Sequence, residues 1–154
     1  MHSTPTTTSW PPVWLKLLLS MAKEPVLVDS SYYIRHLRNG RNALQVLPYL
    51  AVERDLVICG MVRCEVGRGI RNDALRDKFH AAWDIMINVV TDNKLWDQAE
   101  QMAWDLDRHG IVLPLQDILI ACCAKQAGAV VLTHDRHFLS IPGCKVALTP
   151  EELL

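Results

Sequence analysis

The sequence has no CxxC pair, although it contains five cysteines: Cys59, Cys64, Cys122, Cys123 and Cys144. Cysteine-based zinc sites use paired spacings of that kind, so we expect no structural zinc. Most of these cysteines lie in apolar runs, where a free thiol packs as a small hydrophobic group. An odd number of unpaired thiols is typical of a reducing compartment, and we expect a cytoplasmic protein.

The sequence also lacks an apolar run long enough to cross a membrane. The longest one near the N-terminus, residues 10–19, falls short of the roughly 20 residues that a spanning helix needs, and Pro11, Pro12 and Lys16 interrupt it. No positively charged segment precedes this run, so it makes a poor secretory signal. We therefore expect no membrane association, an N-terminal extension at residues 1–24 outside the core, and one domain at residues 25–154.

A marked excess of one charge is missing as well. The 154 residues include 16 basic and 17 acidic side chains, for a formal net charge of −1. Domains that bind nucleic acid are more often clearly basic, so overall charge does not indicate that function. A cluster of acids that recruits cations would hide part of a basic surface in this sum. Half of the residues are apolar, which is enough for a core without disulfides.

From Pro25 onward, short β-branched runs alternate with helical patterns. We predict strands at residues 25–28, 55–59, 87–90, 129–133 and 145–148. We predict helices at residues 30–38, 41–54, 60–67, 73–84, 92–108 and 115–127. Pro48 predicts a break or kink in the second helix. This alternation indicates an α/β fold of three layers, α/β/α, with a mostly parallel central sheet of about five strands.

Acidic residues stand where this fold places ligand sites. Asp29 directly follows the first predicted strand, and Asp135 follows the fourth. Glu65 lies one to two turns into the helix after the second strand, and Asp117 lies in the first turn of the last helix. Ligands of open α/β sheets bind at the carboxyl ends of the strands. We therefore expect these four carboxylates to converge on one edge of the sheet.

Each acid also has a purely structural interpretation. Asp29 fits a helix N-cap, Asp117 a favourable partner of the helix dipole, Glu65 a solvated helix residue and Asp135 a turn residue. The joint arrangement favours a site, because clustered carboxylates repel one another unless cations neutralise them. Oxygen ligands without cysteine suit Mg²⁺ or Mn²⁺. Such sites serve phosphodiester or phosphoryl chemistry.

Four segments of the chain match ordered family motifs. Residues 26–31 (VLVDSS) are an apolar strand that ends in Asp and small hydroxyl residues. Residues 64–69 (CEVGRG), 115–121 (LQDILIA) and 131–138 (VLTHDRHF) follow in that order. Together they resemble the PIN-domain family, and within it the VapC-type toxins, over about residues 25–149. The motifs are weak singly and specific as an ordered set.

This resemblance implies a PIN-like nuclease domain at residues 25–154 that cuts RNA with Mg²⁺ or Mn²⁺. It implies that Asp29, Glu65, Asp117 and Asp135 bind the metal and carry catalysis. Thr133 would hold a carboxylate or water through its hydroxyl. Ser31, the second supporting residue beside Thr133, fills the small polar position after the first acid. His137 replaces a further acid found in some members, which would weaken a second metal site.

Three residues are candidates for contact with the substrate: His134, His137 and Arg68. Histidines at such positions more often lie at the surface or the edge of the core without touching a substrate. Basic residues gather near two motif helices, where they would track a phosphate backbone, form solvated helix faces or meet a protein partner: Arg35, Arg38, Arg41, Arg63, Arg68 and Arg71.

The main functional hypothesis is the endoribonuclease toxin of a toxin–antitoxin pair, a homodimer that acts on RNA and is held by a cognate antitoxin protein. One alternative is a haloacid-dehalogenase-like phosphatase, which needs a second Asp where Ser31 stands. Another is a catalytically silent PIN-like RNA-binding or scaffold module. The presence of all four acids argues against that loss of activity.

Overall fold

The centre of the protein is one parallel sheet. The computed structural model describes residues 12–15 and 23–154. Its strands run in the order β3-β2-β1-β4-β5, and every neighbouring pair is parallel. The strands are β1 (Val26–Val28), β2 (Leu56–Cys59), β3 (Ile87–Val89), β4 (Val130–Leu132) and β5 (Val146–Ala147). The predicted sheet of about five strands is confirmed, and all of its pairings are parallel.

The burial of the strands agrees with their order in the sheet. Every residue of β1, β2 and β4 is buried, as their continuous apolar sequences require for a sheet covered on both faces. In the edge strand β3, by contrast, Ile87 is exposed. β1 lies at the centre, with Val26 opposite both Leu56 of β2 and Val130 of β4.

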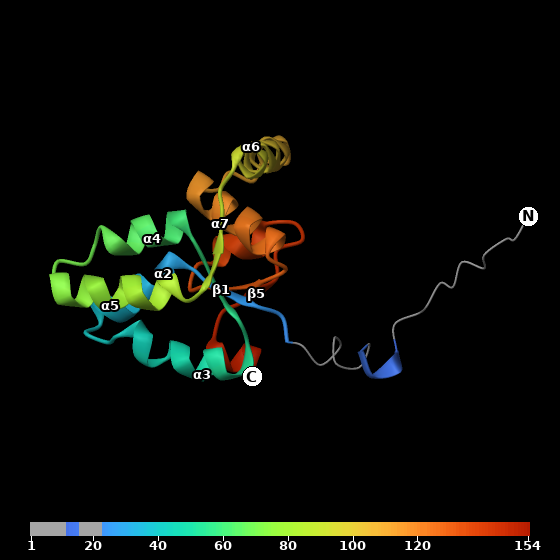
Figure 1. Cartoon of the computed structure of the whole chain (residues 1–154). Coiled ribbons are helices and arrows are strands. Elements are labelled where there is room, and N and C mark those ends of the chain that lie inside the picture. The colour runs from blue at the N-terminus through green and yellow to red at the C-terminus, as the bar shows by residue number, and fades with distance from the viewer. Residues whose placement is uncertain (1–11, 16–22) are drawn as a thin grey trace, which may run out of the picture.

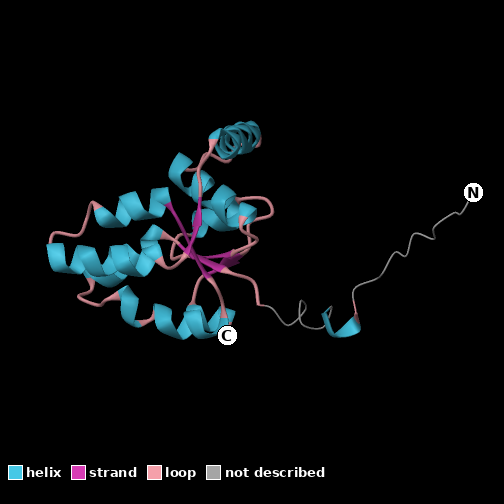
Figure 2. Cartoon of the chain, in the orientation of Figure 1, coloured by secondary structure: helices cyan, strands magenta, loops and turns pink. Residues whose placement is uncertain are grey.

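Helices cover both faces of the sheet. The first group comprises α2 (Ser30–Arg38), α3 (Leu47–Glu53), α4 (Gly60–Gly67) and α5 (Asp73–Asp84), and the second comprises α6 (Asn93–Arg108) and α7 (Leu115–Gln126). Crossovers through the first group step outward from β1 to β2 and β3, and the crossover through the second returns to β4. Right-handed crossovers of opposite direction lie on opposite faces. In Figure 1, α2, α3 and α5 accordingly lie on one side of the strands, and α6 and α7 on the other. Figure 2 shows the strands between the two helical layers.

The middle of the second layer is α7, which contacts α6 as well as β2 and β4. Residues 118–124 of α7 are all buried, so this helix is apolar all round. α6 is amphipathic and buries Leu95, Ala99 and Leu106. Its Trp96 and Trp104 are about half exposed, at 43% and 50%.

The predicted helix at residues 41–54 is two elements. A short 3₁₀ helix, η1 (Ala43–Gln45), precedes α3, and Pro48 lies in the first turn of α3. Proline is tolerated there because its missing N–H has no helical partner in the first turn. Gly40, with φ +67°, ends α2 as the Asn39-Gly40 sequence predicts. Two further 3₁₀ helices, η2 (Arg136–Ser140) and η3 (Pro150–Leu153), lie near the C-terminus.

Most of the predicted extension at residues 1–24 lies outside the described residues, so its separation from the core stays a prediction. At its end, Lys23 forms an ion pair with Glu53 at 2.7 Å, and Glu24 pairs with Lys145. Within residues 12–15 and 23–154, no helix has the length and apolar character needed to cross a membrane.

Candidate metal centre

Two of the predicted acids lie at the carboxyl ends of adjacent strands. Asp29 follows β1 and caps the N-terminus of α2, and Asp135 follows β4 and caps η2. The backbone N–H of Asp29 donates to the Leu132 carbonyl at 2.9 Å, which continues the β1–β4 pairing to the edge of the sheet. Parallel pairing therefore brings together acids that are far apart in the sequence.

The Asp29 carboxylate is buried, at 2% exposure, and one of its oxygens carries most of its hydrogen bonds. Oδ2 accepts from the Ser31 backbone N–H at 3.2 Å, the Ser31 hydroxyl at 2.6 Å and the Thr133 hydroxyl at 2.9 Å. Oδ1 has one long contact with the Ser30 hydroxyl at 3.4 Å. Oδ1 can therefore accept further hydrogen bonds, whereas Oδ2 already accepts from three donors.

The same two hydroxyls hold the loop that follows β4. The backbone N–H of His134 donates to Ser31 Oγ at 3.1 Å, and that of Asp135 donates to Thr133 Oγ1 at 2.9 Å. Each hydroxyl has one proton, which it donates to Asp29, and free lone pairs that accept from the loop. The network fixes the backbone of Asp135 relative to Asp29.

A second group of side chains gathers Asp117, Asp135 and His137. The Nδ1 atom of His137 lies 3.1 Å from Asp117 Oδ2 and 3.2 Å from Asp135 Oδ1. One ligand atom from each of the three residues lies within 4.8 Å of the others. Asp135 also accepts from the His137 backbone N–H at 2.9 Å, which holds the imidazole beside the two acids.

Asp117 is the acid that this environment perturbs most clearly. Its pKa is raised from 3.8 to about 6, mainly by burial and also by the nearby carboxylates of Asp135 and Asp29. The hydrogen bond with His137 acts in the opposite direction. Mutual repulsion of this kind is expected where carboxylates share a focus, and a bound cation would relieve it.

The fourth predicted acid, Glu65, is half-buried on α4, which contacts α7. Among residues 12–15 and 23–154, no hydrogen bond or ion pair joins Glu65 to the other acids. The structure thus brings Asp117 and Asp135 together, with the buried Asp29 near enough to affect the pKa of Asp117. Glu65 stays on a neighbouring helix, and its role remains a prediction.

The candidate substrate residues separate into different environments. His134 stacks on Tyr32, with ring centroids 5.0 Å apart, and burial lowers the pKa of its imidazole. Arg68 is exposed at the end of α4. Arg63, from the same basic group, pairs with Asp84 at 2.9 Å and lies over the Trp83 ring. Arg63 is therefore committed to the α4–α5 contact.

His137 is exposed, as expected of a surface histidine, and the structure also places it between two acids. The signal for this position was its spacing, two residues after Asp135, where some PIN domains carry a further acid. The contact with Asp117 could not be read from the sequence, because it depends on how η2 packs against α7.

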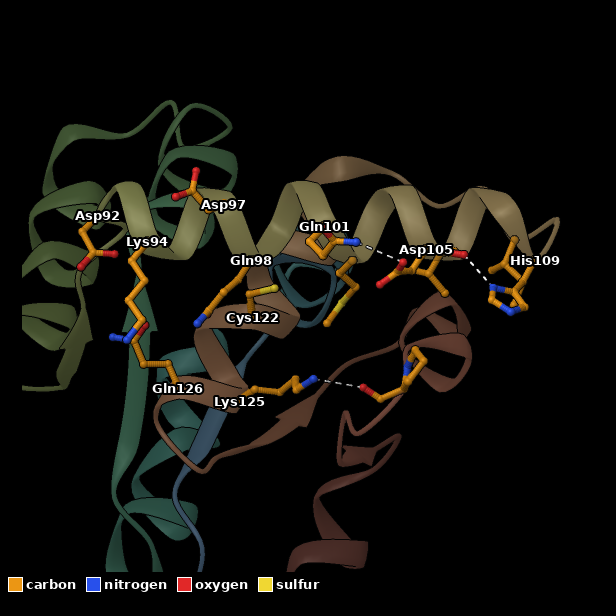
Figure 3. A pocket seen from close by; sticks show the side chains of 14 residues that line it. Asp92, Lys94, Asp97, Gln98, Gln101, Asp105, His109, Cys122, Lys125 and Gln126 are labelled. Carbon is orange, nitrogen blue, oxygen red and sulfur yellow. Dashed lines mark hydrogen bonds between the residues drawn. The ribbon is translucent and has the colours of Figure 1, made fainter.

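A cavity of about 1270 Å³ lies elsewhere, along α6 and α7. Figure 3 shows that some of the polar groups that line it are hydrogen-bonded to one another. Gln101 donates to the Asp105 side chain at 3.1 Å, His109 contacts the Asp105 carbonyl at 2.8 Å, and Lys125 donates to the Pro142 carbonyl at 3.3 Å. The acids described above are not among its lining residues, so this cavity is separate from the candidate metal centre.

The donor set at the edge of the sheet suits a divalent cation. Carboxylate oxygens prefer Mg²⁺ and Mn²⁺, and imidazole nitrogen also binds transition ions. Asp117, Asp135 and His137 supply such atoms at one focus, and each keeps some exposure to solvent. The hydrogen-bonded Asp29 beside them adds negative charge.

The comparisons with known proteins identify the family. The model of the PIN domain matches residues 26–143, which is most of the chain. The chain belongs to the PIN-domain family. All four predicted acids lie inside the matched region. No curated protein sequence matches the chain.

Solved structures share the fold of this PIN domain. VapBC from Salmonella typhimurium, determined bound to DNA, is 20% identical with a TM-score of 0.66, and the match covers 80% of this chain and 97% of the other. VapBC2 from Rickettsia felis, bound to a promoter fragment, is 16% identical with a TM-score of 0.64 over 79% and 96%. FitAcB from Neisseria gonorrhoeae is 20% identical with a TM-score of 0.58 over 79% and 95%.

Proposed function

We propose that this PIN domain is a cytoplasmic endoribonuclease that depends on Mg²⁺ or Mn²⁺ and is the toxin of a toxin–antitoxin pair. The observation that carries the proposal is the meeting of Asp117, Asp135 and His137 within 4.8 Å, beside the buried Asp29. A divalent ion bound there supplies positive charge for phosphate oxygens and lowers the pKa of water at the site.

The residues around the acids orient them. Thr133 and Ser31 hold one oxygen of Asp29 by hydrogen bonds and leave the other with a single long contact. The same hydroxyls fix the loop that carries Asp135. In this way the side chains are positioned before substrate arrives, which is how preorganised sites gain rate.

Glu65 and Arg68 complete the proposed site from α4. Glu65 has the place of the second PIN motif, and we assign it to the metal-binding acids. Arg68 is exposed at the end of that helix and provides a positive charge for the RNA backbone. RNA would therefore approach across α4 and the loop after β4.

The antitoxin partner is supported by the solved relatives, whose names describe VapBC and FitAcB assemblies. We propose a homodimer whose antitoxin lays a segment across the acids, since a cationic side chain neutralises clustered carboxylates without a metal. This partner would keep RNA and ions from the site in the resting complex.

Purified protein incubated with mixed structured RNAs in Mn²⁺, Mg²⁺ or EDTA tests the nuclease, with the cut ends mapped. We expect cleavage with either metal, 5′-phosphate products and none in EDTA. Asp29→Asn and Glu65→Gln should each lose most cleavage, and Asp97→Asn on the exposed face of α6 is the matched control. Circular dichroism confirms that each variant is folded.

Cleavage that persists in EDTA, or that both site variants retain, would refute the assignment. Binding of RNA and metal without any cleavage would instead favour the silent RNA-binding module. Release of phosphate from p-nitrophenyl phosphate, with no cut RNA, would favour the phosphatase.

A further inference from the structure

His137 occupies the point where carboxylates from two elements meet. Asp117 belongs to α7 and Asp135 begins η2, yet the same atom, Nδ1, lies 3.1 Å from one and 3.2 Å from the other. The imidazole is half exposed, so no packing requirement forces it into this position. Its location therefore needs an explanation beyond burial.

Hydrogen bonding alone explains the position incompletely. A protonated Nδ1 carries one hydrogen, so it satisfies one carboxylate well and the other weakly. An ion at the same focus uses both oxygens and the Nδ1 lone pair together. Neighbouring ligands of a six-coordinate ion with bonds of about 2.1 Å lie about 3 Å apart. The distances from Nδ1 to the two carboxylates match that separation.

We propose that His137 is itself a metal ligand, and that its imidazole makes this site favour Mn²⁺ over Mg²⁺. The inference rests on the proposed nuclease function for the presence of a metal, and it adds a ligand and a metal preference. It differs from the expectation drawn from the sequence, in which His137 replaces an acid, weakens a second metal site and is a candidate for contact with substrate.

The chemistry of the two ions gives the direction of the preference. Mg²⁺ is a hard ion that takes oxygen ligands and releases its water reluctantly. Imidazole nitrogen is a softer ligand than a carboxylate oxygen, and Mn²⁺, as a transition ion, accepts it more readily than the harder Mg²⁺ does. A carboxylate at position 137 would restore an all-oxygen site with more negative charge, which would favour Mg²⁺ more.

Protein freed of any affinity tag and of metal provides the test. Calorimetry with Mn²⁺, and with Mn²⁺ in competition with Mg²⁺, gives the ratio of the two affinities. Pulsed electron paramagnetic resonance of bound Mn²⁺ reports ¹⁴N coupling from a coordinated imidazole. The variants are His137→Asp and His137→Asn, and His109→Asn at the exposed end of α6 is the matched control.

We expect ¹⁴N coupling in the wild type and in His109→Asn, and its loss in both His137 variants. The preference for Mn²⁺ should fall about tenfold or more in His137→Asp, the scale on which single changes at metal sites act. Bound Mn²⁺ without ¹⁴N coupling in the wild type would overturn the proposal. So would an unchanged ratio of affinities in His137→Asp.

Failure of the ligand assignment is separable from failure of the nuclease. Mn²⁺ bound with ¹⁴N coupling, but without RNA cleavage in any metal, would refute the nuclease and retain His137 as a ligand. RNA cleavage with Mn²⁺ but without ¹⁴N coupling would retain the nuclease and refute His137 as a ligand. Absence of Mn²⁺ binding at millimolar concentration would refute both.

Discussion

The hydroxyl of Thr133 donates to Oδ2 of Asp29 at 2.9 Å, across 104 residues of sequence. Thr133 is fully buried, and its oxygen also accepts from the Asp135 backbone N–H at 2.9 Å. One hydroxyl thereby links an acid at the end of β1 to an acid at the end of β4. The position of the second carboxylate depends on this link.

Thr133→Val tests the link with almost no change in shape. Valine removes the donor to Asp29 and the acceptor for the Asp135 N–H, and it leaves both groups short of a partner. We expect the free energy of unfolding to fall by about 1–3 kcal/mol, together with a loss of RNA cleavage. Urea unfolding and the RNA assay measure the two effects.

The matched control is Thr149→Val, because Thr149 is exposed and makes no side-chain cap for η3. This variant should differ from the wild type by less than about 0.5 kcal/mol. If Thr133→Val unfolds at the same urea concentration as the control and cuts RNA normally, the hydroxyl does not position the acids.

Much of the fold was predictable because several sequence signals agree. The continuous apolar runs that became β1, β2 and β4 are buried on both faces, and α5 spans the predicted residues 73–84. The least accurate prediction was the helix at residues 41–54. The sequence predicted one helix with a break or kink at Pro48, whereas the chain forms η1 and then starts α3 anew, with Pro48 in its first turn. Local periodicity does not show where one short helix ends and the next begins.

The candidate site was predictable only in part. The strand ends placed Asp29 and Asp135 at one edge, since parallel pairing requires it. The approach of His137 to Asp117 depends on the packing of η2 against α7. No periodic pattern in the sequence indicates that packing. In the same way, the pairing of Arg63 with Asp84 removes one arginine from the predicted basic group.

We expect different effects from the substitution of two arginines, Arg63 within α4 and Arg68 at its end. Arg68 is exposed and, within residues 12–15 and 23–154, has no ion pair, whereas Arg63 pairs with Asp84. In the inactive Asp29→Asn background, Arg68→Gln should weaken RNA binding and reduce the slope of log affinity against log salt by about 0.7. Arg63→Gln should instead alter stability by up to about 1 kcal/mol and leave that slope unchanged.

Filter binding over a range of salt concentrations, with urea unfolding of each variant, measures both effects. If Arg63→Gln lowers the salt slope as much as Arg68→Gln does, the pairing with Asp84 does not hold Arg63 away from RNA. Equal slopes in all three proteins would remove Arg68 from the proposed RNA contact.

A capping residue of α6, a helix that contains none of the predicted site residues, separates stability from catalysis. The Asp92 side chain accepts from the Leu95 N–H at 2.9 Å and caps α6. Asp92→Ala should lower the free energy of unfolding by about 0.5–2 kcal/mol. RNA cleavage at 25 °C should stay within twofold of the wild type, because α6 contributes no predicted site residue. A large loss of cleavage in the folded variant would show that α6 takes part in the site.

The pH dependence of stability in Asp117→Asn tests the repulsion between the carboxylates of the acidic site. The pKa of Asp117 in the folded protein is raised from 3.8 to about 6. Between these values the folded protein holds a proton that the unfolded chain has lost, so a rise in pH lowers stability. Below pH 3.8 this destabilisation is absent, and above about pH 6 it is complete.

Asparagine does not titrate, so Asp117→Asn should gain stability relative to the wild type as pH rises through this window. In EDTA at pH 7 the gain is on the order of 1–3 kcal/mol. Loss of the His137 hydrogen bond and of the favourable charge near the start of α7 will reduce it. Asp73→Asn is the control, since Asp73 is exposed in the first turn of α5 and should show only the helix-dipole loss.

Thermal melts from pH 4 to pH 8, with EDTA or with Mn²⁺, measure these differences. The wild type should gain more from Mn²⁺ than Asp117→Asn does, because binding to the folded state adds stability in proportion to RT ln(1 + [Mn²⁺]/Kd). The variant should also cut no RNA. A variant that melts below the wild type at pH 7 in EDTA, and responds equally to Mn²⁺, would show that Asp117 serves the start of α7 and not the metal.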